Sequence, residues 1–161
     1  MDQILIRTIQ PRDNPFIASI IRESLSEFGA NKQGTVFFDQ STDHLFEVFQ
    51  IERTVYFIAE QNLEVVGGAG IFPSAGLPTD VCELVKMYLK KHVRGMGLGR
   101  KLVNQCLGFA TNAGYTHVYL ETMPELKKAV SMYEHLGFEY LPGPMGNTGH
   151  FGCDVWMIKK L

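Results

Sequence analysis

Three alternating glycines between basic residues constrain this chain more than any other segment. They lie in Arg94-Gly95-Met96-Gly97-Leu98-Gly99-Arg100. A run typical of a β-strand, residues 81–89, precedes them, and a run typical of an amphipathic helix, residues 102–110, follows them. Glycine lets the backbone approach an anion closely, and the first N–H groups of a helix have no partner within it and carry partial positive charge. This order therefore predicts a cradle for a diphosphate.

The sequence of this loop does not match two common diphosphate-binding motifs. A P-loop needs Lys-Ser or Lys-Thr after its last glycine, whereas Gly99 is followed by Arg100 and Lys101. A dinucleotide fingerprint that starts at Gly95 needs a third glycine at position 100, which is arginine, and it opens the first βαβ unit of its domain. From spacing alone, a glycine-rich turn that only reverses the chain stays an alternative.

Three segments in order resemble the GNAT (Gcn5-related N-acetyltransferase) superfamily. Arg94-x-x-Gly97-x-Gly99 resembles its acetyl-CoA loop, and the run from Glu83 to Leu89 resembles its fourth strand. Ala129-x-x-x-Tyr133-x-x-x-Gly137-Phe138 resembles a helix segment of the same family. The resemblance is good over residues 81–140 and weaker over residues 1–75.

The resemblance implies a fold of the mixed α/β class. The GNAT fold has a central, mostly antiparallel sheet that contains one parallel, splayed strand pair, and helices cover both faces. We expect residues 1–161 to form a single N-acetyltransferase domain. The periodicity and turn signals predict strands at residues 4–9, 54–60, 65–72, 81–89, 117–122, 138–141 and 154–159. They also predict four helices: one from Asn14 to Gly29, one over residues 42–50, one from the glycine loop to Gly114, and one over residues 127–136.

Composition excludes several classes of protein. Of 161 residues, 45% are hydrophobic and 20% are charged, and the net charge is −2, so no basic surface for nucleic acid is expected. No apolar run reaches the roughly 20 residues of a membrane span, and the start Met1-Asp2-Gln3 does not resemble a signal peptide. Three widely spaced cysteines are typical of reduced thiols, so a cytoplasmic location is predicted.

The resemblance assigns acetyl-CoA as cosubstrate, without a metal. It implies that the pantetheine arm pairs with the backbones of Met87 and Leu89 and so takes the place of a missing strand. It implies further that the glycine loop binds the pyrophosphate through a set of residues with free N–H groups or positive charge. That set is Val93, Arg94, Gly95, Gly97, Leu98, Gly99 and Arg100.

Catalytic roles also follow from the resemblance. Glu83 lies four residues before Met87, at the place of the catalytic glutamate in histone-type members, and is expected to act as general base through a water. The Met87 N–H is expected to bind the oxyanion, and Tyr133 to protonate the leaving thiolate. The alternatives are a solvated or ion-paired glutamate and a tyrosine that only packs on the sheet.

One position departs from the pattern. Many relatives carry Asn three residues before the alanine that matches Ala129, and here this residue is Leu126. Its polar contact near the acyl end is therefore absent. Leu126 could line an apolar wall instead, which leaves the acyl-chain preference open, with acetyl as the default.

The acceptor side is expected to involve residues 146–154. His150, Phe151 and Cys153 are predicted to border the acceptor, and Phe37 and Phe38, with Asp39, are further candidates from the segment between the first helices. His150 and Cys153 in the spacing His-x-x-Cys are two potential ligands, too few for a structural zinc site, which uses four.

The sequence therefore predicts an acetyl-CoA-dependent N-acetyltransferase that acts by direct attack of a primary amine in a ternary complex. Two alternatives stay open: a non-catalytic module that senses acetyl-CoA, and a protein or peptide N-acetyltransferase. The predicted partners are a small-molecule amine or a peptide, with neither nucleic acid nor membrane, and a homodimer through the last strands is an open possibility.

Overall fold

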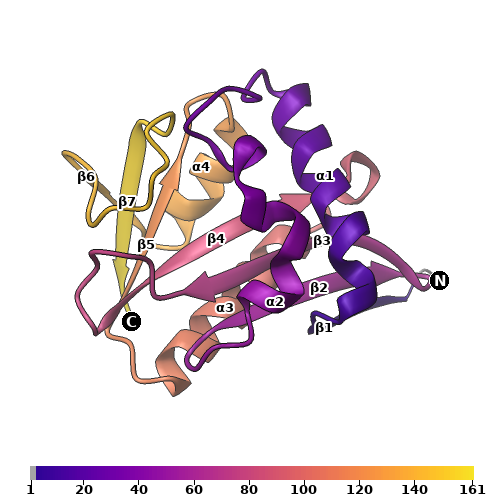
Figure 1. The fold of residues 1–161 in the computed structure, drawn as a ribbon, viewed down its shortest axis with the longest axis horizontal. Coiled ribbons are helices and arrows are strands. Elements are labelled where there is room, and N and C mark those ends of the chain that lie inside the picture. The colour runs from indigo at the N-terminus through magenta and orange to yellow at the C-terminus, as the bar shows by residue number, and fades with distance from the viewer. Residues whose placement is uncertain (1–2) are drawn as a thin grey trace.

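Residues 3–161, described by a computed structural model, form one seven-stranded sheet with helices on both faces (Figure 1). Met1 and Asp2, at the acidic start, lie outside the described residues. The strands are β1 (Ile4–Thr8), β2 (Val55–Gln61), β3 (Glu64–Phe72), β4 (Val81–Leu89), β5 (His117–Thr122), β6 (Glu139–Leu141) and β7 (Val155–Lys160). The α-helices are α1 (Asn14–Glu27), α2 (Leu45–Val48), α3 (Leu98–Asn112) and α4 (Lys127–His135), with short 3-10 segments at Pro11–Asp13, Val36–Phe38, Gln40–His44 and Lys91–Val93. The predicted order of strands and α-helices is confirmed.

The sheet has the order β1-β2-β3-β4-β5-β7-β6, and all neighbours except β4 and β5 are antiparallel. The parallel pair β4–β5 is connected through α3, a crossover that parallel strands require. This pair is short, because only Val81–Glu83 of β4 pairs with His117–Tyr119 of β5. The predicted mixed sheet with one parallel, splayed pair is thus confirmed.

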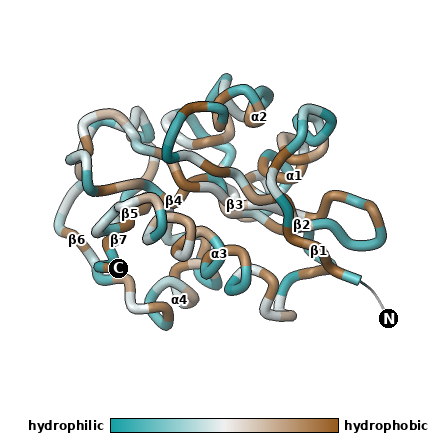
Figure 2. Tube along the Cα trace, turned by 90° about the horizontal axis from the view of Figure 1, so that it is seen from below, coloured by the Kyte–Doolittle hydropathy of each residue, from teal (hydrophilic) through white to brown (hydrophobic). Residues whose placement is uncertain are grey.

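The sheet separates two hydrophobic cores (Figure 2). On one face, Ile17, Ile21 and Leu25 of α1 pack with Tyr56 and Ile58 of β2. On the other face, apolar side chains of α3 pack with strands β2 to β5 and with residues of α4. Both long helices are amphipathic and bury one face only. Among residues 3–161, no helix is long and apolar enough to cross a bilayer.

Strand β4 contains a bulge next to the point where it leaves β5. Gly68 pairs with Tyr88 and Gly70 pairs with Val85, so Ala69 lies opposite two residues, Lys86 and Met87. Lys86 has a φ of 52°, which is rare for a residue with a side chain and marks the extra residue of the bulge. The bulge bends the second half of β4 away from a regular ladder.

Two local predictions were wrong. Asn14 is not the N-cap of α1 but its first residue, after a 3-10 turn and Asp13. Its side-chain oxygen accepts the N–H of Phe46 at 2.9 Å instead, and so caps α2. The helix expected over residues 42–50 is therefore a 3-10 segment followed by the single turn of α2, because this cap starts a new helix at Leu45.

The close approach of β3 to β4 gives a first prediction. A Cβ added at Gly67 would lie 2.5 Å from the Tyr88 carbonyl oxygen, so Gly67→Ala should lower the free energy of unfolding by about 1–3 kcal/mol. Gly108 is the matched control: it is exposed in the middle of α3 with nothing within 4 Å, and Gly108→Ala should stabilise by about 0.5–1 kcal/mol. Urea unfolding measures both changes, and an unchanged stability of Gly67→Ala would contradict this packing.

Candidate functional site

The glycine loop leads directly into the N-terminus of α3. Gly95 and Gly97 have φ values of 76° and 80°, and Gly97 is the N-cap of the helix. A Cβ at either glycine would meet no atom within 4 Å, so the space in front of the helix is open. Because helix N-terminal N–H groups and positive-φ glycines favour anions, this geometry suits a phosphate group. Val93 and Leu98, also predicted here, bury their side chains in the core, so only their backbones face the loop.

A cavity of about 360 Å³ begins at this loop and runs along β4. Its walls combine the predicted loop residues with one edge of β4 and the start of α4. The lining residues are Ser24, Phe28, Met87, Tyr88, Leu89, Arg94, Gly95, Gly97, Gly99, Arg100, Leu126, Lys128, Ala129 and Met132. An elongated anionic ligand with an apolar arm fits such a lining.

Arg94, which is predicted to bind the pyrophosphate, lines this cavity and already has partners within the protein. Its guanidinium makes an ion pair with Glu27 at 3.0 Å, donates to the Leu89 carbonyl at 3.0 Å and stacks over the Phe28 ring. Its charge is therefore already partly neutralised by α1. Arg100 is exposed at the cavity and is the arginine with a freer charge.

The edge of β4 that lines this cavity carries backbone groups without a strand partner. Lys90 N–H donates to the Val66 carbonyl, while Leu89 lies opposite Gly67. The Leu89–Gly67 pair is therefore of the non-hydrogen-bonded kind, and the N–H and C=O of Leu89 point away from β3. Strand alternation places Met87 on the same edge. Since β5 pairs with β4 only as far as Glu83, this edge is open to a ligand.

A second, narrow cavity of about 40 Å³ lies on the other side of the same wall. It shares Met87, Tyr88, Leu126 and Ala129 with the first cavity, and Tyr133 and Glu83 line it as well. The remaining lining residues are Val36, Leu84, Val85, Lys86, Leu120, Glu121, Thr122, Met123, His150 and Cys153. The structure thus brings Glu83, Met87 and Tyr133, the predicted catalytic residues, to one place.

Tyr133 is buried on α4, with its ring edge-on to Phe138 at 5.7 Å between centroids. Burial raises the pKa of its phenol, which keeps the hydroxyl protonated at neutral pH. A protonated phenol that lines the cavity can donate a hydrogen bond into it.

Glu83 is a buried carboxyl group, 3% exposed, on the last residue of β4 that pairs with β5. Burial raises its pKa to about 7; the charge of Glu121 adds to this rise, and a hydrogen bond from the Ser74 hydroxyl opposes it. A carboxyl group whose pKa lies near neutrality can both accept and release a proton under ordinary conditions.

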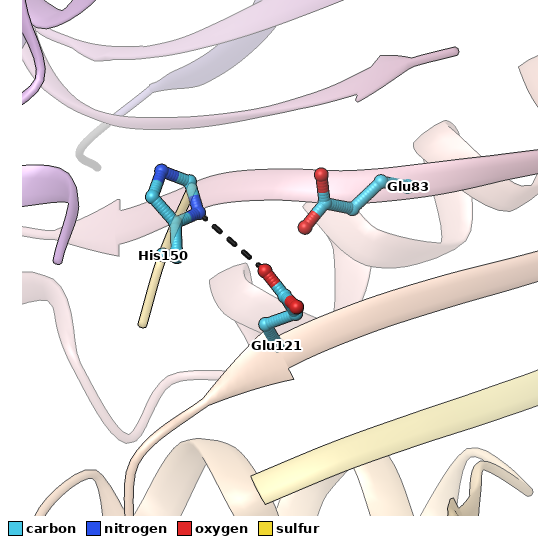
Figure 3. A group of neighbouring side chains, drawn as sticks. All are labelled: Glu83, Glu121 and His150. Atoms are coloured by element: carbon cyan, nitrogen blue, oxygen red, sulfur yellow. Dashed lines mark ion pairs between the residues drawn. The ribbon is translucent and has the colours of Figure 1, made fainter. Parts of the chain in front are cut away.

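Glu83 faces Glu121 and His150, which come from β5 and from the loop before β7 (Figure 3). His150 Nε2 lies 2.6 Å from Asp39, and its Nδ1 lies 3.6 Å from Glu121. Burial alone would lower the pKa of His150, but these two carboxylates outweigh it and raise the pKa to about 9. The Lys86 ammonium lies 3.6 Å from Asp39, and burial lowers its pKa.

Glu83, Glu121 and His150 also form the one group of three potential metal ligands found among residues 3–161. One ligand atom from each lies within 4.8 Å of the others. The sequence analysis considered His150 with Cys153 instead. Because His150 already bonds to Asp39 and faces Glu121, we interpret this group as part of an ion-pair network, and a reaction without metal stays a prediction.

The predicted acceptor-side residues separate into two groups. His150 and Cys153 line the narrow cavity. Phe37, Phe38 and Phe151 do not line it; Phe38 and Phe151 are exposed, and Phe37 packs edge-on to Phe38, so their role at the acceptor stays a prediction. The two loops that carry these residues are joined where Gly152 N–H donates to the Gly34 carbonyl at 2.8 Å.

Sequence reasoning missed Glu121 and Ser74. Glu121 follows two residues after Tyr119, the parallel partner of Glu83, so strand alternation puts Glu121 and Glu83 on one face. A lone carboxylate within the apolar run of β5 was the signal that could have found it. Ser74 lies in the loop before β4, and nothing in its sequence context marks it.

The comparisons with known proteins agree on one family. The model of the acetyltransferase (GNAT) family matches residues 18–138. YjgM of Escherichia coli K12, an uncharacterized N-acetyltransferase, is 42% identical, with 98% of this chain and 95% of that protein covered.

Solved structures show the same fold. A GNAT-family acetyltransferase of Staphylococcus aureus has a TM-score of 0.84 at 17% identity, with 98% of this chain and 99% of that chain covered. A Salmonella typhimurium protein solved with its cofactor acetyl-CoA has a TM-score of 0.76 at 19% identity, with 98% and 94% covered.

The His150 ion pairs predict a pH-dependent stability. The folded pKa of about 9 lies above the ordinary 6.5, so the contribution is complete below pH 6.5 and is lost as the pH rises through 9. Urea unfolding of the wild type and of His150→Gln should therefore differ most at acidic pH, with a difference that shrinks across this window. His135→Gln, at an exposed position on α4, is the control. A difference that stays constant with pH would show that the imidazolium does not stabilise the fold.

Proposed function

The chain belongs to the acetyltransferase (GNAT) family and is an N-acetyltransferase, and on that premise we propose that it transfers the acetyl group of acetyl-CoA to a primary amine by direct attack in a ternary complex. One observation carries this proposal. The long cavity that begins at the phosphate cradle and the narrow cavity with Glu83 share a wall at Met87, Tyr88, Leu126 and Ala129. A thioester at this wall can meet an amine from the other side.

Complementarity supports the long cavity as the binding site of acetyl-CoA. Its diphosphate suits the N–H groups at Gly97, Leu98 and Gly99, and its amide-containing pantetheine arm suits the unpaired edge of β4 at Met87 and Leu89. The Leu89 carbonyl already accepts from Arg94, which leaves the Leu89 N–H for the ligand. The bound acetyl-CoA in the Salmonella structure of similar fold supports the choice of ligand.

In the reaction the nitrogen loses two protons, the sulfur gains one, and an oxyanion must be stabilised. Glu83 takes a proton from the ammonium group, directly or through a water, and the freed nitrogen attacks the thioester carbon. The Met87 N–H stabilises the oxyanion of the tetrahedral intermediate. When the C–S bond breaks, Tyr133 gives its proton to sulfur, and the second proton lost by the nitrogen restores the phenol. The proton on Glu83 passes to solvent, so the products are the N-acetyl amine, CoA thiol and one proton.

The cysteines favour direct attack over a covalent acetyl-enzyme. Cys82, Cys106 and Cys153 are all buried and free. Burial raises the pKa of the Cys82 and Cys153 thiols to about 12, so neither is a thiolate at neutral pH.

Leu126, which replaces the usual Asn, lines both cavities with an apolar side chain at the acyl end. A short, unfunctionalised acyl group such as acetyl suits that wall.

Free-thiol release from acetyl-CoA across amino acids, polyamines, aminoglycosides, simple alkylamines and short peptides tests the proposal. Release that depends on a small primary amine supports it. Release only with peptides would show that the acceptor is a polypeptide. Binding of acetyl-CoA by calorimetry without release for any amine would overturn it in favour of a sensor.

Tyr133→Phe tests the general acid. Because the variant keeps the ring packing against Phe138 and loses only the hydroxyl, kcat should fall by about 10²-fold or more while acetyl-CoA affinity stays nearly unchanged. Steady-state kinetics and calorimetry measure the two effects. Tyr140→Phe, an exposed tyrosine on β6, is the control. A kcat equal to that of the wild type would remove Tyr133 from the chemistry.

The pH profile tests Glu83 as the base. With a pKa of about 7 and the ionised form active, kcat/KM should rise with pH up to about 7, and Glu83→Gln should lose this limb together with about 10²-fold or more of the rate. Ser74→Ala should move the limb to higher pH, because the Ser74 hydroxyl donates to the carboxylate and lowers its pKa. The same limb in Glu83→Gln would mean that another group titrates.

A further inference from the structure

The narrow cavity holds a second carboxylate that the reaction as described above does not use. Extending the proposed function, on which this inference rests, we propose that Glu121 binds the acceptor as a primary ammonium ion beside Glu83, so that the enzyme selects amines that arrive protonated. Glu121 is then the residue that holds the cation, and Glu83 is the residue that takes its proton.

The geometry of the two carboxylates suits one nitrogen between them. One oxygen of Glu83 and one of Glu121 lie within 4.8 Å of each other (Figure 3). A charge-assisted N–H···O bond has a length of about 2.8 Å, so a nitrogen at that distance from both oxygens spans up to about 5.6 Å. An ammonium group has three N–H donors and can therefore bond to both carboxylates at once.

The charges around this cavity leave one negative charge unbalanced. Three carboxylates meet there, from Asp39, Glu83 and Glu121, and two cations, Lys86 and His150. Lys86 and His150 both pair with Asp39, and His150 also faces Glu121. With Glu83 ionised, the group carries a net charge of one negative unit in a buried place. An unbalanced buried charge is costly, and either a proton on Glu83 or a cationic ligand removes that cost.

Unequal surroundings give the two carboxylates different roles. The Glu121 carboxylate accepts hydrogen bonds from the Tyr119 hydroxyl at 2.7 Å and from the Thr148 hydroxyl, and it faces His150. Burial opposes ionisation of Glu121, but these contacts outweigh it and lower its pKa. Among residues 3–161, one hydroxyl group donates to Glu83, that of Ser74, and burial raises the pKa of Glu83 to about 7. Glu121 therefore stays charged while Glu83 exchanges the proton.

The size and walls of the cavity define the rest of the acceptor. At about 40 Å³ the narrow cavity is far smaller than the long one of about 360 Å³, so it suits only the reacting end of the acceptor. Val36, Met123 and Leu126 supply apolar walls next to the carboxylates. The acceptor class is thus a primary aliphatic ammonium ion with an apolar carbon next to the nitrogen.

Two amines of similar shape separate this role from a structural one. Ethylamine is a cation at neutral pH, whereas trifluoroethylamine is mostly neutral. The ratio of kcat/KM for ethylamine to kcat/KM for trifluoroethylamine is measured by thiol release for the wild type and for Glu121→Gln. We expect the ratio to fall by about tenfold or more in Glu121→Gln, since a hydrogen bond to a charged group is lost for one amine only. Glu121→Asp, which keeps the charge, should recover part of the ratio.

Control variants and outcomes complete the test. Glu52→Gln removes an exposed carboxylate that lines neither cavity, and its ratio should equal that of the wild type. Equal losses for both amines in Glu121→Gln would overturn the inference and leave the proposed function intact. If neither amine is turned over, the two are compared as competitive inhibitors against the acceptor found in the thiol-release panel, with the same expected loss of preference for the cation. If no amine of any class releases thiol from the wild type, the proposed function fails and this inference fails with it.

Discussion

The separation of β4 from β5 after Glu83 is the constraint on which the rest of the site depends. The two strands pair over three residues only, and the bulge at Lys86 turns the second half of β4 away from a regular ladder. In most sheets an interior strand uses both of its edges, so its backbone has nothing left to offer a ligand. Here an interior strand keeps one edge open from Leu84 onwards while β3 holds the other. The open edge faces the long cavity, and the gap beside it contains the narrow one. A single irregularity thus creates an open backbone edge and the space beside it, where we propose that the two substrates meet.

The buried charges use the same gap. Glu83 is the last residue of β4 that pairs with β5, and Glu121 lies two residues beyond the part of β5 that pairs with β4. Each carboxylate therefore enters the space that the separating strands leave. Asp39 and His150 arrive from two loops that touch through Gly34 and Gly152. In a low-dielectric place each of these groups changes the protonation of the others. The His150–Asp39 contact therefore ties the two loops to this charged cluster, in which we propose that one cation binds. In the proposed reaction, selection of the acceptor and its deprotonation are then properties of one cluster.

The sequence predicted what local signals encode. The Gly95–Gly99 loop, the bounds of β4 and β5, and the gathering of Glu83, Met87 and Tyr133 followed from short motifs with fixed spacing. The length of α2 did not, because its start is set by the Asn14 side chain, which lies 32 residues away in sequence from its partner Phe46. Glu121 and Ser74 join Glu83 only through strand register and the course of the loop before β4, which no window of sequence contains. Phe38 and Phe151 lie on loops near the site with exposed side chains, and their role at the acceptor stays a prediction.

A crystal structure of the protein with acetyl-CoA tests the central claim most directly. The account predicts the diphosphate at the N–H groups of Gly97 to Gly99, the pantetheine amides on the open edge of β4 at Met87 and Leu89, and the thioester carbonyl at the Met87 N–H, between Tyr133 and Glu83. A thioester that lies away from the wall shared by the two cavities, or a pantetheine arm that leaves the edge of β4 unpaired, would contradict it.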